Sequence, residues 1–344
     1  MGTAGTHSHE QEVTAHHQGD ACDYRQAVDE LIGRQLREWP AVRANYAALD
    51  RKVRTRRLLL GASTIVLQYN PGRRRSSAAR IDAQRPCFLC DVHQPPEQET
   101  LEWRGKYKIQ VNPYPIFPRH LTIASLRHEP QRIAGRIGDM LRLAEDLPDF
   151  VIFYNGPHCG ASAPCHFHFQ AGNKDFLPLC DEVYSGTISL LDEGDDGMIG
   201  LVEDLGRSVI SIETRTRAKT EDYFNRLLLC LPKHGEEPEP MVNVLCWHNP
   251  RRNYHTVVFP RIKHRPDCYG TGPGRLLLSP ASVDMGGVWA VPRLNDYETL
   301  TALQVQHLYD ELCMSCADIH SLFRQLKNDI QSTKTDNPKL HKEK

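Results

Sequence analysis

The sequence of 344 residues predicts an α+β fold, in which helices pack against a mainly antiparallel sheet. Three observations support this fold class. The first half of the chain reads as strands, one amphipathic helix and strands again. The second half is a weaker echo of that order, without a residue-level repeat. Short turns rich in Asn and Pro separate neighbouring strand segments, which favours hairpins. We therefore expect a first half and a second half that form a pseudo-repeat.

Apolar periodicity predicts the elements of the first half in chain order. They are a helix over 23–59 that breaks at Pro40, a strand over 64–69, paired strands over 108–111 and 120–124, a helix over 133–147, and strands over 150–154 and 166–170. The paired strands flank Asn112-Pro113-Tyr114-Pro115, a sequence suited to a turn. Pro40 divides the first helix because proline has no amide hydrogen to donate.

The same patterns predict the elements of the second half. They are a strand over 208–213, a helix over 220–231, a hairpin of strands over 241–247 and 254–259, a strand over 287–291 and a closing helix over 300–326. The turn of the hairpin is Asn249-Pro250-Arg251-Arg252-Asn253. We expect a disordered start over 1–22, the two halves over 23–180 and 181–330, and a disordered tail over 331–344.

Composition excludes several classes of function. The formal net charge is −1, which provides no general attraction to nucleic acid or to an anionic membrane. No segment approaches the roughly 20 apolar residues that a transmembrane helix needs. The 11 cysteines come without an export signal, which favours a cytoplasmic protein with free or metal-bound thiols.

Two features of the first half suggest chemistry. In the strand over 166–170, alternation places His166, His168 and Gln170 on one face and two phenylalanines on the other. A solvated strand edge is the alternative interpretation. The preceding loop contains Asn155-Gly156 and Gly160-Ala161-Ser162, whose backbone N–H groups are suited to an anion, with the Ser162 hydroxyl as a further donor.

These residues resemble the active-site stretch of the histidine-triad superfamily. The similarity rests on Phe153-Tyr154-Asn155-Gly156, Gly160-Ala161-Ser162 and His166-x-His168-x-Gln170. It is greatest with the transferase branch: galactose-1-phosphate uridylyltransferase, the dinucleoside tetraphosphate phosphorylases and the GDP-hexose phosphorylases. The span from about 60 to 295 also resembles a bacterial family of unknown function in this superfamily. One departure is that three residues separate Ser162 from His166, where the transferases commonly have two.

The resemblance implies a histidine-triad-like fold and a double-displacement mechanism. His168 would attack the α-phosphorus of a nucleoside-diphosphate sugar or a dinucleoside polyphosphate and form a nucleotidyl-histidine. Gln170 can donate a hydrogen bond to a phosphate oxygen but cannot supply a proton, which favours transfer to inorganic phosphate or a sugar phosphate. The alternatives are a catalytically idle nucleotide-binding or sensing protein and a nucleotide hydrolase. The base, the sugar and the oligomeric state, including a homodimer, stay open.

The resemblance also implies contacts outside the histidine strand. Cys87-x-x-Cys90 alone suits a redox pair, buried thiols or a metal, but the family pattern adds His128 and His166 as ligands of a structural zinc. The rival ligands are His120, His158, Cys159 and Cys165. By the same resemblance, Asn112 lies near the ribose and Arg73 binds the nucleotide.

Overall fold

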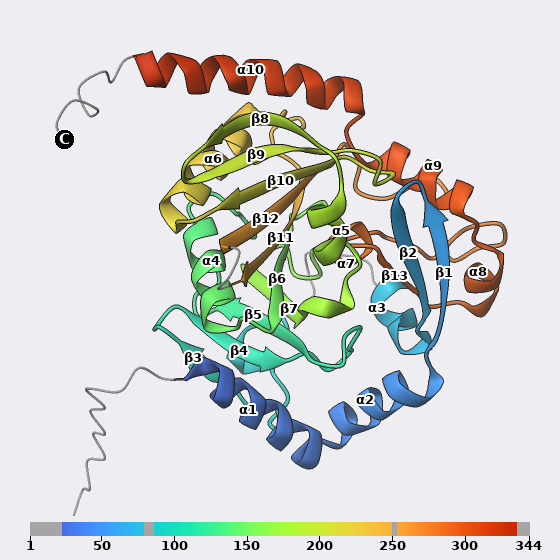
Figure 1. Ribbon diagram of the computed structural model, residues 1–344. Helices are drawn as coiled ribbons and strands as arrows, with labels where there is room; N and C mark the ends of the chain where they lie inside the picture. The colour runs from blue at the N-terminus through green and yellow to red at the C-terminus, as the bar shows by residue number, and fades with distance from the viewer. Residues whose placement is uncertain (1–22, 79–85, 250–252, 336–344) are drawn as a thin grey trace, which may run out of the picture.

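A ten-stranded sheet, in which all neighbouring strands are antiparallel, forms the centre of the computed structural model, which describes residues 23–78, 86–249 and 253–335 (Figure 1). The strand order is β3-β4-β5-β7-β6-β11-β12-β10-β9-β8. The strands are β3 (Leu101–Trp103), β4 (Tyr107–Val111), β5 (His120–Ser125), β6 (Phe150–Asn155), β7 (His168–Asn173), β8 (Ile188–Gly194), β9 (Gly197–Val202), β10 (Val209–Thr214), β11 (Val242–Asn249) and β12 (Asn253–Pro260).

This order contains the same arrangement twice. In the first half β3, β4 and β5 are followed by the helix α4 (Ile137–Asp146) and then by β6 and β7. In the second half β8, β9 and β10 are followed by the helix α6 (Arg217–Cys230) and then by β11 and β12. The halves join through the antiparallel pair β6–β11, so a single sheet spans both. The expected α+β fold with two pseudo-repeated halves is confirmed.

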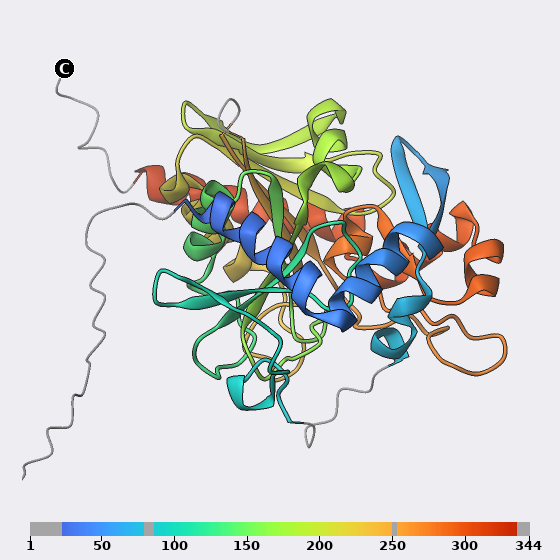
Figure 2. The ribbon, with the colours of Figure 1, turned by 90° about the horizontal axis from the view of Figure 1, so that it is seen from below.

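Each face of the large sheet has its own core. On one face, α1 (Tyr24–Glu38), α2 (Pro40–Lys52), α4, α6 and α10 (Cys316–Thr335) contribute to an apolar cluster. Figures 1 and 2 show α1 lying along β3 and β4 and α2 leading away from them, with α10 beside β8 at the opposite end. Because Phe167 and Phe169 belong to this cluster, the side chains of His168 and Gln170 lie on the other face.

A three-stranded sheet packs against that other face. It consists of β1 (Arg54–Leu60), β2 (Ser63–Tyr69) and β13 (Val288–Val291), and β13 runs parallel to β2. The remaining helical segments are η1 (Pro71–Arg73), α3 (Arg74–Ala78), η2 (Asp91–His93), η3 (Lys174–Phe176), α5 (Leu179–Ser185), α7 (Ser282–Met285), α8 (Leu294–Thr299) and α9 (Ala302–Leu312). β1 and β2, from the early part of the chain, and β13, from the late part, therefore pack together over the central strands of the large sheet.

Several sequence expectations were wrong. The first helical region does not reach residue 59, because β1 begins at Arg54 and pairs with β2 across a turn in which Gly61 has a φ of +59°. The strands β8 and β9 were missed. The single closing helix expected over 300–326 is instead two helices, α9 and α10, and Thr301 begins α9 by accepting a hydrogen bond from Gln304 N.

Two of the predicted domain boundaries do not coincide with the ends of helices. The boundary at residues 180/181 falls inside α5, and the helix α10 continues to Thr335, five residues into the expected tail. The expected disordered start over 1–22 and the rest of the tail, 336–344, lie outside the described residues. Among the described helices, none is long and apolar enough to cross a membrane.

Candidate functional site

The strand β7 begins at His168, two residues later than expected, so His166 lies in the turn before it. The buried side chain of Gln131 holds this start in place. Its Oε1 accepts a 2.8 Å hydrogen bond from His168 N, and its Nε2 donates to His168 O and to Asn155 O. Sequence reasoning missed Gln131, because only the fold brings it beside β7.

The imidazole of His168 is in the form that a nucleophile requires. Its Nδ1 lies 2.9 Å from the carbonyl oxygen of His166, so Nδ1 carries the proton and donates it. The other nitrogen, Nε2, therefore has a free lone pair. Burial lowers the pKa of His168 to about 4, which keeps the ring neutral near pH 7.

Gln170 lies two residues further along the same face of β7. Its Oε1 is 3.0 Å from Nε2 of His120, a buried residue at the start of β5. His120 was expected only as a rival metal ligand. It lies outside the metal group described below, and the structure places its ring against Gln170 instead.

Strand registers extend this face across β5 and β4. Thr122 lies opposite Gln170 in the β5–β7 pair, and Gln110 lies opposite Thr122 in the β4–β5 pair. Gln110 is only 1% exposed, and its Nε2 has no hydrogen-bond partner among the described residues. A buried amide without a partner costs about 1–3 kcal/mol, so this nitrogen would gain from an acceptor. The sequence pattern held no signal for Gln110.

Asn112 and Arg73 both lie against the hairpin that joins β4 to β5. Asn112 Nδ2 donates to Thr122 Oγ1 over 3.1 Å, and Asn112 Oδ1 accepts from Tyr114 N. Arg73 donates to Tyr114 O over 3.0 Å, and its charge contributes to lowering the pKa of His120 to about 3, after burial. Both predicted substrate contacts thus lie near the face that carries Gln170, at its edge.

Polar groups of the loop before β7 form hydrogen bonds within the protein that the sequence did not predict. Asn155 is 5% exposed, and its Oδ1 accepts hydrogen bonds from Asn243 Nδ2 and Ser282 N. Two N–H groups of the expected anion cradle already have backbone partners, because that of Gly156 donates to Val242 O and that of Ala161 donates to Gly156 O. The availability of Asn155 and of the loop N–H groups to a substrate is therefore smaller than the sequence suggested.

Two other residues of that loop, Gly160 and Ser162, differ in their environment. Gly160 has a φ of +95°, and a Cβ there would lie 2.5 Å from Ala281 Cβ, so the position requires glycine. Ser162 is exposed. A cavity of about 170 Å³ adjoins the loop at Pro157 and His158, but neither His168 nor Gln170 lines it.

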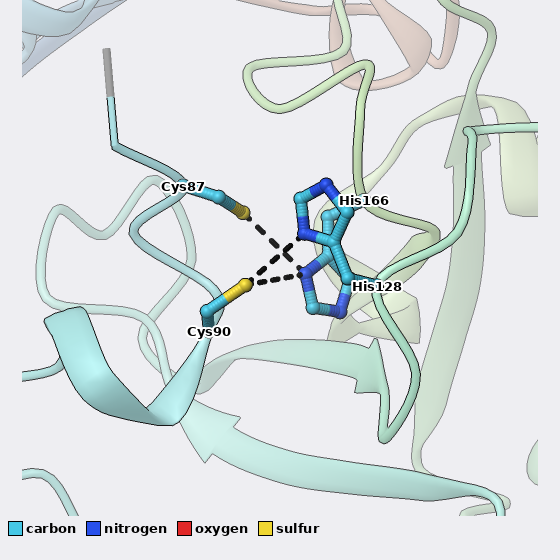
Figure 3. A group of neighbouring side chains, drawn as sticks. All are labelled: Cys87, Cys90, His128 and His166. Carbon is cyan, nitrogen blue, oxygen red and sulfur yellow. Dashed lines mark hydrogen bonds between the residues drawn. The ribbon is translucent and has the colours of Figure 1, made fainter.

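The four predicted metal ligands come together beside this loop (Figure 3). The ligand atoms of Cys87, Cys90, His128 and His166 all lie within 4.8 Å of one another. Cys90 Sγ is 3.1 Å from His128 Nδ1 and 3.5 Å from His166 Nδ1, and Cys87 Sγ is 3.4 Å from His166 Nδ1. All four rival ligands lie outside the group: His120, His158, Cys159 and Cys165.

This group fits a tetrahedral zinc ion. Zinc–sulfur bonds of about 2.3 Å and zinc–nitrogen bonds of about 2.0 Å place neighbouring S and N ligands roughly 3.5 Å apart. The observed S–N distances of 3.1–3.5 Å are close to that spacing. His166 Nε2 donates to Ser125 O over 2.8 Å, which leaves Nδ1 deprotonated and directed at the thiols.

The metal group connects directly to the histidine strand. His166 is one of its members and accepts the His168 Nδ1–H through its backbone carbonyl. Leu89, which lies between the two cysteines, packs with Ala124 and Ala163, and Ala124 is opposite His168 in the β5–β7 pair. The metal group and the start of β7 are therefore one structural unit.

Comparison with known proteins supports the resemblance. Residues 31–173 match the family model described as a domain of unknown function, DUF4922, a shorter span than the 60–295 expected for such a family. Galactose-1-phosphate uridylyltransferase of Lactococcus lactis subsp. cremoris is 33% identical over 84 residues, which is 24% of this chain and 17% of that protein. Diadenosine 5',5'''-P1,P4-tetraphosphate phosphorylase 2 of Saccharomyces cerevisiae is 30% identical over 26% of this chain and 32% of its own length.

The similarity to solved structures extends further along the chain. The structure of yeast Ap4A phosphorylase in complex with Ap4A superposes with a TM-score of 0.55 at 18% identity, covering 80% of this chain and 96% of the yeast chain. A second structure of that phosphorylase gives a TM-score of 0.53 at 16% identity and the same coverage. The chain thus has a histidine-triad-like fold, and its resemblance to the transferase branch of that superfamily is confirmed.

Proposed function

We propose that this protein is a nucleotidyltransferase or phosphorylase that works through a nucleotidyl-histidine intermediate on His168. The curated relatives are matched over only 14% to 32% of their own length, so the proposal depends on the residues themselves. The observation that carries the proposal is the orientation of the His168 ring. Its Nδ1–H donates to the His166 carbonyl, which leaves Nε2 as a lone-pair nucleophile on the face it shares with Gln170.

The proposed first step balances without an external acid. The lone pair of His168 Nε2 forms a bond to the α-phosphorus, and the bond between that phosphorus and the bridging oxygen breaks. The electron pair leaves with a sugar phosphate or a nucleotide, which is already a stable anion. Gln170 Nε2 donates a hydrogen bond to a non-bridging oxygen, where charge develops.

The second step reverses these bonds with another acceptor. An oxygen of inorganic phosphate or of a sugar phosphate attacks the phosphorus, and the electron pair of the P–N bond returns to Nε2. Water at about 55 M competes, but an oriented acceptor gains several kcal/mol over an unbound one. Gln170 offers no proton shuttle to activate water.

The donor would be a nucleoside-diphosphate sugar or a dinucleoside polyphosphate, since both leave as phosphates. The names of the similar proteins, a galactose-1-phosphate uridylyltransferase and an Ap4A phosphorylase, support one class each. Gln110, Asn112 and Arg73 are the proposed additional contacts, and Gly160, Ala161 and Ser162 border the phosphates. We propose that the neighbouring group of Cys87, Cys90, His128 and His166 holds a structural zinc ion, which would fix the start of β7.

A product screen tests the proposal. The protein is incubated with nucleotide sugars and dinucleoside polyphosphates, with and without inorganic phosphate or sugar phosphates, and products are identified by mass. We expect an acceptor to accelerate turnover at least about tenfold over water, equivalent to roughly 1.4 kcal/mol of barrier. If only the nucleoside monophosphate forms with every acceptor, the protein is a hydrolase. Binding without turnover of any donor would identify an idle nucleotide-binding protein.

A further inference from the structure

His120 is connected to Gln170 although the two residues are 50 positions apart in the chain. The β5–β7 pairing places Gly172 opposite His120, and a Cβ on Gly172 would collide with the ring of Phe117. Glycine therefore lets Phe117 lie against β7. Phe117 contacts the His120 ring edge-on, with ring centroids 5.3 Å apart. This packing directs the His120 ring diagonally across the strand pair toward Gln170.

The backbone decides which nitrogen of His120 carries the proton. The N–H of Ile116 donates to His120 Nδ1 over 3.2 Å, so Nδ1 must be an acceptor. The buried neutral ring then has its proton on Nε2, which lies 3.0 Å from Gln170 Oε1 and donates to it. Because this N–H can only donate, the oxygen of the Gln170 amide must face His120.

We infer that His120 is a positioning residue that orients the Gln170 amide, so that its oxygen faces His120 and its NH₂ group faces the transferring phosphate. The inference rests on the proposed function for what the amide does, and on the hydrogen bonds for how the amide is held. An amide free to rotate by 180° presents its oxygen to the anionic phosphate in half of its orientations. Oxygen facing an anion is repulsive, whereas NH₂ donates to it.

The surrounding side chains hold the His120 ring in one orientation. Its ring lies between Phe117 and Phe153, with the centroid of Phe153 6.0 Å away, and its own carbonyl accepts from Asn112 N and Tyr46 Oη. A different ring orientation would break the hydrogen bonds at Nδ1 and Nε2 and change the contacts with Phe117 and Phe153. Among the described residues, no hydrogen bond holds the Gln170 Nε2, so the amide is fixed from its oxygen side.

The test uses His120→Phe, which keeps an aromatic ring but removes the N–H. We expect kcat for nucleotidyl transfer to fall at least tenfold while KM changes less than threefold, because the amide makes one of several contacts to the donor and its hydrogen bond strengthens where charge develops in the transition state. The matched control is His255→Phe, a buried histidine on the same sheet face that has no contact with Gln170. This control should keep the wild-type kcat and product ratio within twofold.

A double-mutant cycle separates orientation from folding. If His120 acts through Gln170, His120→Phe should add less than a twofold loss when Gln170 is already alanine. Fully multiplicative losses in His120→Phe and Gln170→Ala would overturn the inference, since they would indicate a general structural effect. Melting temperatures of all variants identify any that fail to fold.

A readout without turnover keeps the inference distinct from the proposed function. The ¹⁵N NMR spectrum of the wild-type protein near pH 7 should show His120 with Nε2 protonated and Nδ1 bare. The side-chain amide signal of Gln170 should move in His120→Phe and stay in place in His255→Phe. A proton on Nδ1 instead would overturn the inference, whereas a wild type without any nucleotidyl transfer would overturn only the proposed function.

Discussion

The strands β7 and β12 occupy corresponding places in the two halves, and each carries a buried histidine on the same sheet face. His168 of β7 has Ala124 opposite it, and among the described residues nothing hydrogen-bonds its Nε2. His255 of β12 lies between Trp247 and Glu213, stacks on the tryptophan with ring planes 8° apart, and has its Nε2 3.3 Å from the Glu213 carboxylate. The same architecture thus holds one histidine as a candidate nucleophile and packs the other into the core.

The difference comes from what surrounds each strand. The first half has the metal group and the glycine-containing loop next to β7, whereas the described part of the second half has no comparable group of cysteines and histidines. A carboxylate beside His255 would also repel an incoming phosphate. The pseudo-repeat therefore supplies a scaffold twice, and local side chains decide which copy has a reactive site.

The largest expected effect tests that difference directly. His168→Gly should reduce nucleotidyl transfer at least about 10³-fold, because the nucleophile is lost, and should leave the fold intact. His255→Gln should change the rate less than about threefold. Initial rates measure both, and labelled donor should leave acid-labile, base-stable label on the wild-type protein alone. Equal losses in the two variants would contradict the comparison.

Metal removal should affect one half of the sheet. Purified protein should contain about one zinc ion per chain, and Cys87→Ser should lower the metal content and reduce the free energy of unfolding by more than about 2 kcal/mol. The control is Cys165→Ser, an exposed thiol in the same region that is outside the group.

Hydrogen exchange then locates the effect of Cys87→Ser. Amide exchange should become faster in β5 and β7, where the metal group is attached, and stay slow in β10 and β12. Metal-free protein with wild-type stability would show that Cys87 and Cys90 are ordinary thiols. Uniformly faster exchange in both halves would show that the metal group acts on the whole sheet.

A smaller effect is expected at Gln170. Gln170→His introduces a ring that can deliver a proton, so we expect slower transfer and a several-fold larger hydrolysed fraction. The ratio of nucleoside monophosphate to diphosphate formed in phosphate buffer measures this change. An unchanged ratio would show that Gln170 does not determine the choice of acceptor.

The smallest effect at neutral pH is expected for the contribution of His120 to stability, which changes only on the acid side. Burial, reinforced by the charge of Arg73, lowers the pKa of His120 to about 3, below its ordinary value near 6.5. The unfolded chain therefore binds the proton first, so the stability is complete above about pH 6.5 and falls as the pH drops toward 3.

His120→Phe should reduce this acid-side slope by about 1.4 kcal/mol per pH unit between roughly pH 6 and 4. Denaturant unfolding at several pH values measures the slope. Above about pH 7 the slopes of the variant and the wild type should agree. An unchanged slope on the acid side would mean that His120 is charged, or exposed, in the folded protein.

Much of the first half could be predicted because its signals are local. Alternation in His168-Phe169-Gln170 and the periodicity over Ile137–Asp146 each require only neighbouring residues. β1 was mistaken for helix because its Leu58-Leu59-Leu60 run is compatible with a helix or a strand. Pairing with β2 makes this segment a strand. β8 and β9 were missed because Asp192-Glu193 in β8 and the two glycines of β9 interrupt their apolar residues. Their pairing with each other and of β9 with β10 makes them strands.

The sequence by itself determined the α+β class, the repeated order of elements, the nucleophile candidate His168 and the four residues of the metal group. The fold class and the order of elements depend on residue type and spacing along the chain, whereas the role of His168 and the two histidines of the metal group came from the resemblance to the histidine-triad superfamily. Only the tertiary structure revealed Gln131 beneath β7, Gln110 across the sheet and His120 against Gln170. The hydrogen bonds of Gln131 and His120 join residues 37 and 50 positions apart, and Gln110 shares a sheet face with Gln170 across the intervening Thr122. These neighbours meet because the sheet aligns strands in one register, which no local pattern in the chain encodes.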